Sequence, residues 1–509
     1  MSRKPGRTFI EKDFKKNGAV LITVLLVTVV IIALVSLLPN QTPQEGDVSR
    51  SGVSRSFMFP VAYTDDGSSL KVIDSDLNVS AVDDSVSDAV HDFQKEKIYY
   101  IRENVLYEYD IKQNNRRILI GGGVEDYRVL NDRSAIVYLT TAGELVLYDY
   151  SGKTGRTLCR CGEVSSLGKL VMVGNSGFLY FAETDQTNQK GTLYFSDNEG
   201  DSRKISDDVQ LETARISPKD RYITYKKRGD LYVADSSGQE IAARSGASLV
   251  ETAKQPLAIR ELNTLSEFNQ GVEISYAFSA GEKGTGGEIS YFTGEDFRPV
   301  SGGVLALVYY SEESDRLFYT VSSETESGAV DLMMSVKGKD GQRVMTASPS
   351  GEFIWCEGTG KIFCLDQGEL YRVSVFDDFK KVQLATGVSS MKLYPGKSFI
   401  VYTDALYNNY YVLSDHATEQ VAAGASRLYG ITNNSYLLES TYNGAHMSLD
   451  LVENSSMQRL DSDIEMPICF DSNFDHVLYL TWEGLVLRNS QGAHLVDNTS
   501  TVSLVRLVV

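Results

Sequence analysis

The side chains that most often carry out chemistry are few in this 509-residue sequence and lie far apart. There is no His-Glu-x-x-His zinc motif, Gly-x-Ser-x-Gly elbow, Walker A loop or Cys-x-x-Cys pair. The scattered histidines are more typical of structural positions than of a metal cluster: His91, His416, His446, His476 and His494. We therefore predict no catalytic, metal or cofactor-binding residue and no cofactor, although a fold could still gather distant residues at one place.

Two short stretches resemble ligand loops, but each has a simpler explanation. Gly284-Thr285-Gly286-Gly287 could cradle a phosphate, yet no helix follows it whose N-terminus would hold the anion, so a hairpin loop is expected. The oxygen-rich stretches 74–76 and 197–201 lack the bidentate glutamate of an EF-hand loop. We interpret them as turns in which the aspartate binds backbone N–H groups.

The five cysteines are Cys159, Cys161, Cys356, Cys364 and Cys469. Because the number is odd, at least one is unpaired within the monomer. Cys356 and Cys364 flank the 357–360 turn, and a hairpin with that loop would place Cys356 opposite Lys361. Cys159 and Cys161 share one face of a strand in poor geometry for a disulfide. We predict that most of these thiols are small core residues.

The elements that would position any site are repeated β-hairpins. The clearest copy is 216–241, where two short apolar strands are joined by a polar turn. Similar pairs recur eleven times, mostly 36 to 46 residues apart, near positions 61, 98, 136, 179, 222, 274, 317, 353, 399, 436 and 477. Four short antiparallel strands in such a period are typical of a β-propeller blade. The fold class predicted is all-β, a β-propeller.

One interval between hairpins, from 222 to 274, is longer than the others. Apolar residues at 259, 262, 265 and 268 follow a helical spacing within it. Eleven units exceed the usual four to eight blades of a ring. We therefore expect two tandem rings, 57–255 and 271–509, joined by a helical connector at 256–270. A single large ring is the alternative.

The N-terminal region predicts a membrane anchor. Residues 19–38 are an uncharged apolar run long enough to cross a bilayer, preceded by six basic and two acidic residues in 1–18. This favours an uncleaved transmembrane signal-anchor helix with a cytoplasmic tail at 1–18, over a cleaved signal peptide. Residues 39–56 form a polar linker, and the rest of the chain is expected outside the cell membrane. That external part has 43 basic and 66 acidic residues, which argues against a nucleic-acid partner.

The turn-and-strand phrase resembles the WD40-like repeats of bacterial TolB-type propellers. The matching segments are 217–223, 348–354 and 394–400, each similar to a Ser-Pro-Asp-Gly turn followed by an apolar strand. Asp220 and Tyr394 depart from that pattern. The resemblance implies the propeller fold and a binding role, and does not imply membership of the TolB envelope system.

Three functions fit these observations. The first is a membrane-tethered extracytoplasmic module that binds a cell-envelope protein or glycan. The second is a propeller enzyme of the lyase, glycosidase or lactonase type, which needs carboxylates or histidines converging at the channel mouth. The third is a sensor, for which a tail of about 18 residues is too short to hold a signalling domain. We favour the first, a protein that is not an enzyme.

Overall fold

The computed structural model describes residues 59–508, except 66, 131, 161–170, 175, 186, 218–220, 252–273, 282–285, 394–399, 405–409, 414–417, 423–426, 432–434, 443–445, 454–455 and 472–473. The chain separates into two units, 1–53 and 54–509, and every described residue belongs to the second. The predicted tail, anchor and linker at 1–56 therefore lie outside the described residues, as does the predicted connector at 256–270. Within the described part, no helix is long and apolar enough to span a membrane.

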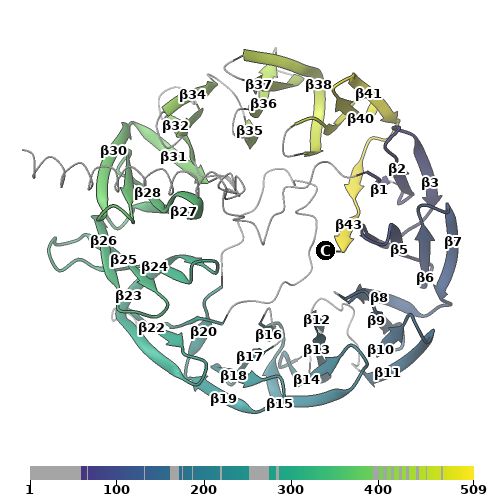
Figure 1. Ribbon diagram of the computed structural model, residues 1–509, viewed down its shortest axis with the longest axis horizontal. Coiled ribbons are helices and arrows are strands. Elements are labelled where there is room, and N and C mark those ends of the chain that lie inside the picture. Colours follow the sequence, from purple (N-terminus) through teal and green to yellow (C-terminus); the bar gives the residue numbers. More distant parts are fainter. Residues whose placement is uncertain are drawn as a thin grey trace, which may run out of the picture. The chain divides into compact units, whose positions relative to one another are not determined.

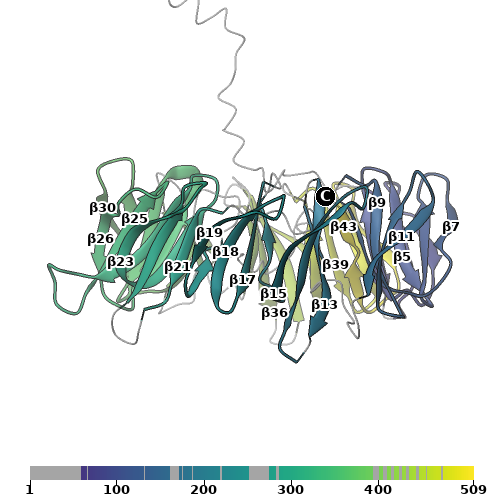
Figure 2. The ribbon, with the colours of Figure 1, turned by 90° about the horizontal axis from the view of Figure 1, so that it is seen from below.

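The second unit is built mainly from short antiparallel strands, and several of them, including 97–102, 177–185 and 477–481, are buried along most of their length. We divide the described strands into eleven groups of four, called blades 1 to 11 in chain order. The first strand of each group is its inner strand and the fourth its outer strand (Figures 1 and 2). All eleven predicted hairpins are confirmed as antiparallel pairs.

The first five blades have the following strands. Blade 1 comprises β42 (Val502–Leu504), β1 (Val61–Asp65), β2 (Leu70–Ile73) and β3 (Val79–Asp83). Blade 2 comprises β4 (Asp88–Asp92), β5 (Lys97–Arg102), β6 (Val105–Asp110) and β7 (Asn115–Ile120). Blade 3 comprises β8 (Val124–Val129), β9 (Ala135–Thr140), β10 (Glu144–Asp149) and β11 (Thr154–Arg160). Blade 4 comprises β12 (Val171–Val173), β13 (Gly177–Asp185), β14 (Lys190–Asp197) and β15 (Ser202–Gln210). Blade 5 comprises β16 (Arg215–Ile216), β17 (Tyr222–Lys227), β18 (Asp230–Asp235) and β19 (Glu240–Arg244).

The long strands β23 (Phe297–Ser311) and β38 (Ser456–Phe470) each serve two consecutive blades. Blade 6 comprises β20 (Ala247–Leu249), β21 (Tyr276–Ser279), β22 (Gly287–Phe292) and the first part of β23, while blade 7 comprises the rest of β23, β24 (Arg316–Ser322), β25 (Val330–Val336) and β26 (Gln342–Ala347). Blade 8 comprises β27 (Glu352–Cys356), β28 (Lys361–Asp366), β29 (Glu369–Ser374) and β30 (Lys380–Thr386), with the short 3-10 turn η3 (Glu357–Thr359) after β27. Blade 9 comprises β31 (Val388–Leu393), β32 (Ile400–Asp404), β33 (Tyr410–Leu413) and β34 (Thr418–Ala422). Blade 10 comprises β35 (Arg427–Ile431), β36 (Ser435–Tyr442), β37 (His446–Glu453) and the first part of β38. Blade 11 comprises the rest of β38, β39 (Val477–Thr481), β40 (Gly484–Asn489) and β41 (Gly492–Asp497).

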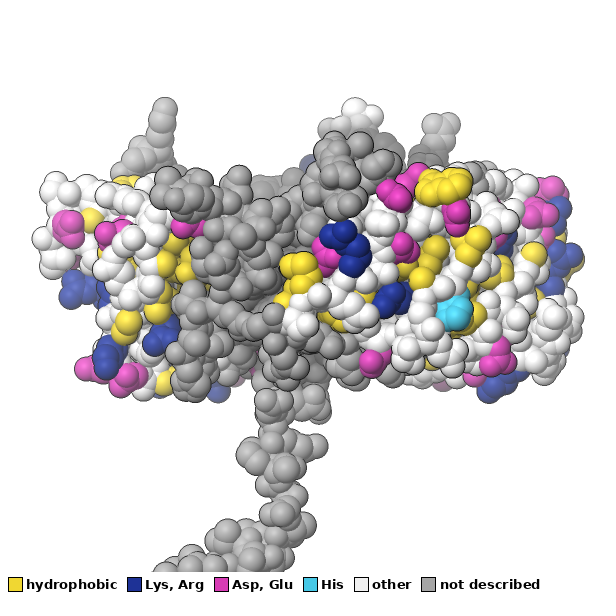
Figure 3. All heavy atoms as spheres, turned by 90° about the horizontal axis from the view of Figure 1, so that it is seen from above, with side chains coloured by type: hydrophobic (Ala, Val, Ile, Leu, Met, Phe, Trp, Pro, Cys, Tyr) yellow, Lys and Arg dark blue, Asp and Glu magenta, His cyan; other side chains and the backbone are white. Residues whose placement is uncertain are grey.

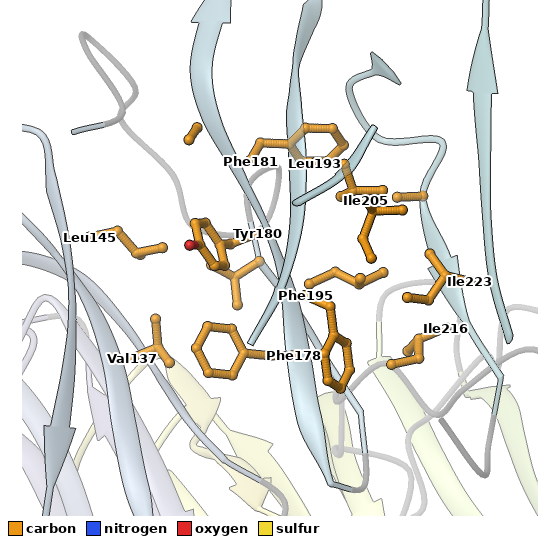
Figure 4. Packing of buried hydrophobic residues seen from close by; sticks show 14 of the residues in the cluster. Val137, Leu145, Phe178, Tyr180, Phe181, Leu193, Phe195, Ile205, Ile216 and Ile223 are labelled. Carbon is orange, nitrogen blue, oxygen red and sulfur yellow. The ribbon is translucent and has the colours of Figure 1, made fainter. Parts of the chain in front are cut away.

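The core lies between blades, because both faces of each sheet are covered by its neighbours. Figure 4 shows one such cluster, where Val137 and Leu145 of blade 3 pack with Phe178 and Phe195 of blade 4 and Ile223 of blade 5. Comparable clusters join the other neighbouring blades whose side chains are described. Each strand between two other blades is therefore in contact with a neighbouring blade on both faces of its sheet.

The ends of this unit meet. Val61 and Tyr63 of blade 1 pack with Leu478 and Leu487 of blade 11. Strand β42 pairs with β1 and supplies the inner strand of blade 1, and β43 (Arg506–Val508) pairs in parallel with β4 (Figure 1). The C-terminal strands thus connect the last blade with the first two.

The boundary that we expected between two rings falls inside blade 6. Strand β20, before 252–273, pairs with β21 after it, with Leu249 opposite Ala277. Leu231 of blade 5 also shares a buried cluster with Phe292 of blade 6. Packing that crosses this boundary, together with contact between blades 1 and 11, favours the single-ring alternative over two tandem rings. The long interval is an insertion between the inner and second strands of one blade.

Candidate functional site

Two ion pairs lie together where the inner strands of blades 2 and 3 meet. On β43, Arg506 donates from Nη2 to Asp88 Oδ1 of β4 at 2.5 Å. On β8, Arg128 donates from Nη1 to Asp126 Oδ1 at 2.9 Å. The buried Tyr127 between Asp126 and Arg128 donates its hydroxyl to the carbonyl oxygen of Tyr99. Two carboxylates and two guanidinium groups are therefore gathered from three strands.

The two carboxylates influence each other electrostatically. Burial raises the pKa of Asp88, the adjacent Arg506 opposes that shift, and the charge of Asp126 adds to it. A carboxyl group with a raised pKa beside a second carboxylate is the usual chemistry of acid–base pairs. Here each carboxylate also has a guanidinium partner, so the group as a whole is close to neutral and suits recognition of polar groups.

Several other carboxylates connect neighbouring blades. Asp92 at the end of β4 is fully buried and accepts from Arg133 Nε of blade 3 at 3.1 Å. Arg244 of blade 5 reaches Glu288 of blade 6 at 2.9 Å. Figure 3 shows acidic and basic side chains side by side over the described atoms of the face in view. Ion pairs of this kind connect neighbouring blades, and we interpret them as structural contacts rather than as a ligand site.

The described histidines occupy separate environments. His91 on β4 is 1% exposed, and burial lowers its pKa to about 4. His476 Nδ1 lies 3.0 Å from Asp471 Oδ2 in blade 11, and His494 is half-buried on β41. His416 lies outside the described residues, and the side chain of His446 is not described. Among the described residues, no three or more His, Cys, Asp or Glu side chains are placed to hold a metal ion.

The oxygen-rich stretches are turns, as expected. Asp197 Oδ1 accepts the backbone N–H groups of Glu199 at 3.0 Å and Asp201 at 2.8 Å. Asp74 Oδ1 accepts those of Asp76 and Asn78, both at 2.9 Å. These carboxylates are used in closing hairpins.

In the described part of the glycine-rich stretch, Gly286 precedes β22 and Gly287 is the first residue of this strand, which pairs with β21 on one side and β23 on the other; residues 284 and 285 lie outside the described part. Gly286 has a φ of +71°, and a Cβ there would lie 2.6 Å from the carbonyl carbon of Gly303. Glycine is thus required by the close approach of two backbones.

The cysteine predictions are confirmed where the structure describes them. Cys356 pairs with Lys361 across the β27–β28 hairpin, in the predicted register. Cys356, Cys364 and Cys469 are buried, and Cys159 is half-buried. Burial raises the pKa of Cys364 to about 12. Cys161 lies outside the described residues.

Two exposed aromatic side chains were missed by sequence reasoning. Phe376 follows β29 and is 70% exposed, and Trp482 lies in the β39–β40 turn and is 73% exposed. Each is followed directly by an acidic residue, Asp377 or Glu483. An aromatic residue within a polar turn is the signal that could have identified them, because strand aromatics of this chain are mostly buried.

A shallow hollow lies between blades 6 and 7. It is lined by Arg298, Pro299, Lys339 and Asp340 and has a volume of about 480 Å³. Arg298 Nη2 also donates to the carbonyl oxygen of Gly338 at 2.5 Å. Because the hollow is shallow and Arg298 is already hydrogen-bonded within the protein, it is a weaker candidate than the exposed aromatic turns.

No protein-family model and no curated protein matches the sequence. Among the solved structures that match, a eukaryotic initiation factor is 7% identical with TM-score 0.40, covering 87% of this chain and 95% of that one. Dipeptidyl peptidase 4 of Porphyromonas gingivalis is 12% identical with TM-score 0.33, covering 72% of this chain and 58% of that one. PorZ, a surface component of the type-IX secretion system of the same organism, is 12% identical with TM-score 0.25, covering 88% and 68%. These similarities are low, and the fold is defined by its strand pairing and packing.

Proposed function

We propose that this chain is a membrane-tethered extracytoplasmic β-propeller, with eleven WD40-like blades in one ring, that binds a protein or glycan of the bacterial cell envelope. The observation that carries the binding role is the pair of exposed aromatic turns. Trp482 and Phe376 project from tightly packed blades, and their exposed rings contribute little to the stability of the fold. Exposed tryptophan and phenylalanine on a rigid scaffold are typical anchors of a binding surface.

The membrane location is supported by the sequence of residues 1–38. The basic tail places the N-terminus in the cytoplasm, and the apolar run at 19–38 would anchor the chain in the membrane. N-terminal sequencing of the protein recovered from membranes tests this. A mature terminus near residue 40 would mean a cleaved signal peptide and would contradict the anchor.

The binding role is tested by affinity capture. Detergent-solubilised full-length chain, and its Trp482→Ala/Phe376→Ala double variant, would be immobilised and exposed to envelope extract. We expect the parent to capture a partner in a saturable manner. The double variant should retain at least tenfold less of that partner. Glu103→Gln is the matched control, since Glu103 is an exposed turn residue in blade 2. The two turns lie at opposite ends of their antiparallel strands, so equal capture by parent and double variant would reject each of them as a binding surface.

A second candidate function is an enzyme acting at the inner strands. The observation that favours it is the raised pKa of Asp88 beside Asp126. Release of reducing ends or unsaturated products from envelope polysaccharide, abolished in Asp88→Asn, would support it. If the parent chain shows no turnover that depends on Asp88 or Asp126, this candidate is rejected.

A further inference from the structure

Strand β43 closes over a buried histidine of blade 2. Among the described strands, it alone lies beyond the inner strand of a blade, and it pairs in parallel with β4, with Leu507 opposite His91 (Figure 1). The pairing covers residues 506–508, which we call the latch, and within the described part of the chain no strand pairs with its other edge. Parallel pairing is also slightly less stable per residue than antiparallel pairing. The latch is therefore held along one edge only and over a short length.

His91 lies between the latch and blade 1. It is 1% exposed, and its Nε2 has no hydrogen-bond partner among the described residues. Opposite residues of paired strands share one face of a sheet, so His91 faces the same side as Ile98, which packs with Ala62 and Val72 of blade 1. Leu507 of the latch packs with the apolar cluster between blades 1 and 11. The imidazole therefore lies among apolar side chains and is covered by the latch.

Two carboxylates near His91 favour its protonation through their charges, Asp92 and Glu96. Each of them also has a basic partner, since Asp92 accepts from Arg133 and Glu96 pairs with Lys112. Burial outweighs both carboxylates and lowers the pKa of His91 to about 4. A protonated His91 is therefore disfavoured while the latch is closed.

The other elements packed against this face of β4 direct no carboxylate at His91 within the described part of the chain. In the row of His91, the titratable side chain across β5 and β6 is Tyr109, whose hydroxyl is hydrogen-bonded within blade 2. Arg116 of β7 follows Tyr109 in that row and is paired with Asp83. Blade 1 contributes apolar side chains to this face. Arg506 and Asp88 lie on the opposite face, because neighbouring strand residues alternate.

The pH dependence of the latch follows from these surroundings. When the latch opens, His91 meets water and its pKa returns to about 6.5. A state that binds a proton more tightly is favoured as the pH falls. The closed latch is therefore fully favoured above pH 6.5 and loses stability as the pH falls from 6.5 to about 4. Between pH 7.5 and pH 5, the two pKa values give an increase in opening of up to about 30-fold.

We propose that the latch and His91 form an acid-sensitive switch, in which His91 takes up a proton at mildly acidic pH and residues 506–508 leave β4 while the blades stay folded. The ring does not depend on the latch for closure, because Val61 of blade 1 packs with Leu478 of blade 11 and β42 pairs with β1. Opening uncovers the inner edge of β4, which can then accept another extended segment. This inference does not depend on the proposed binding function.

The test is hydrogen–deuterium exchange of the full-length chain in detergent at pH 7.5 and pH 5, with rates corrected for the intrinsic pH dependence of exchange. We expect protection of 88–92 and 506–508 to fall at least tenfold at pH 5, while β28 of blade 8 keeps its protection. His91→Gln takes up no proton, so its ratio of protection between the two pH values should be close to one. Because glutamine lowers protection at both pH values in this buried site, the ratio is the readout, and His91→Leu repeats the measurement with an apolar side chain.

Two further variants separate His91 from other causes. His494→Gln is the matched control, since His494 is half-buried on the outer strand of blade 11 and should leave the parent ratio unchanged. Asp88→Asn removes the ion pair with Arg506, so it should weaken the latch at both pH values but keep the ratio.

Three outcomes overturn the inference. The first is a ratio in His91→Gln and His91→Leu that equals the parent ratio. The second is a loss of protection in β28 equal to that of the latch, which would mean that the whole unit opens in acid. The third is a ratio that disappears in Asp88→Asn but persists in His91→Gln, which would assign the response to the ion pair.

Discussion

The hydroxyl of Tyr63 donates a 2.6 Å hydrogen bond to the carboxylate of Asp497, a residue 434 positions later in the chain. The same Asp497 oxygen lies 2.7 Å from Lys71 Nζ, and Lys71 also reaches Asp65 at 3.0 Å. Tyr63 is fully buried and the Asp497 side chain is 17% exposed, so this contact between blade 1 and blade 11 is partly shielded from solvent. It is the polar counterpart of the apolar packing that joins the two ends of the unit.

The first prediction concerns this contact. Asp497→Asn removes the charge facing Lys71 and weakens the acceptor for Tyr63, which should lower the free energy of unfolding by about 1–3 kcal/mol. Chemical denaturation of the full-length chain measures the change. Asp201→Asn is the control, because Asp201 forms an exposed interblade pair with Arg156 and should cost less than about 1 kcal/mol. Equal effects of the two substitutions would mean that the Tyr63–Asp497 contact contributes nothing to closure.

The second prediction concerns Asp83, which accepts from Arg102 and Arg116, both at 2.5 Å, and from Tyr100 at 2.9 Å. Burial raises the pKa of Asp83, but hydrogen bonds from Tyr100, a backbone N–H and Arg116 outweigh it, so the pKa lies below its usual 3.8. The folded state therefore gains stability above pH 4, and loses it as the pH falls through the lowered pKa. Asp83→Asn should lower the free energy of unfolding by about 1.5–3 kcal/mol at pH 7 and by less at pH 3.

Urea unfolding at several pH values measures that difference. Glu103→Gln provides the control, since Glu103 is 79% exposed at the adjacent turn. A gap between parent and Asp83→Asn that stays constant from pH 7 to pH 3 would show that the carboxylate charge is not what stabilises this junction.

The third prediction compares two tyrosines of β17. Tyr222 opens β17, which follows the inner strand β16, and is only half-buried. Tyr225 is fully buried, stacks on Tyr232 with ring centres 5.5 Å apart and donates to Glu240 at 3.1 Å. Tyr225→Asp should therefore prevent stable folding, whereas Tyr222→Asp should be tolerated. Soluble yield and thermal melts distinguish the two, and equal tolerance would contradict the assigned burial.

The fourth prediction tests the single ring. Residues 57–255 and 271–509 expressed separately should fail to give cooperative β-type melts, because the cut separates β20 from β21 and blade 1 from its inner strand. Circular dichroism of each fragment, and of the mixed pair, measures this against the intact chain. Two soluble fragments that melt cooperatively on their own would restore the tandem-ring arrangement.

The fifth prediction concerns the thiols. Cys356, Cys364 and Cys469 are buried, so they should not react with an aromatic disulfide reagent in the folded chain and should react fully in denaturant. The half-buried Cys159 should react at an intermediate rate. Cys159→Ser is the control that assigns this rate. Rapid reaction of Cys364 would mean that blade 8 opens readily.

Sequence reasoning was most successful for local structure. Strand alternation and turn residues gave all eleven hairpins, and the 357–360 turn gave the Cys356–Lys361 register, because these features depend on neighbours in the chain. Closure was not predicted, because β42 and β43 are three-residue strands with no turn signal of their own. The predicted boundary falls between two paired strands, β20 and β21, because a long stretch of sequence separates them.

The candidate surfaces were less predictable than the fold. Asp88 and Arg506 lie 418 positions apart, and only ring closure brings them together. Phe376 packs on Arg316 of another blade and on Gly360, so its exposure follows from tertiary packing. The short turn that contains Phe376 gave only a weak signal, an aromatic residue before two aspartates.

The position of β42 and β43 has a consequence for biosynthesis. These strands come after every blade in the chain, yet they complete the inner edge of the first two blades. While the polypeptide is being synthesised, the inner edges of β1 and β4 therefore have unpaired backbone groups, a state prone to association with other chains. A chain truncated before β42 would have nearly all of its blades but would keep these edges open.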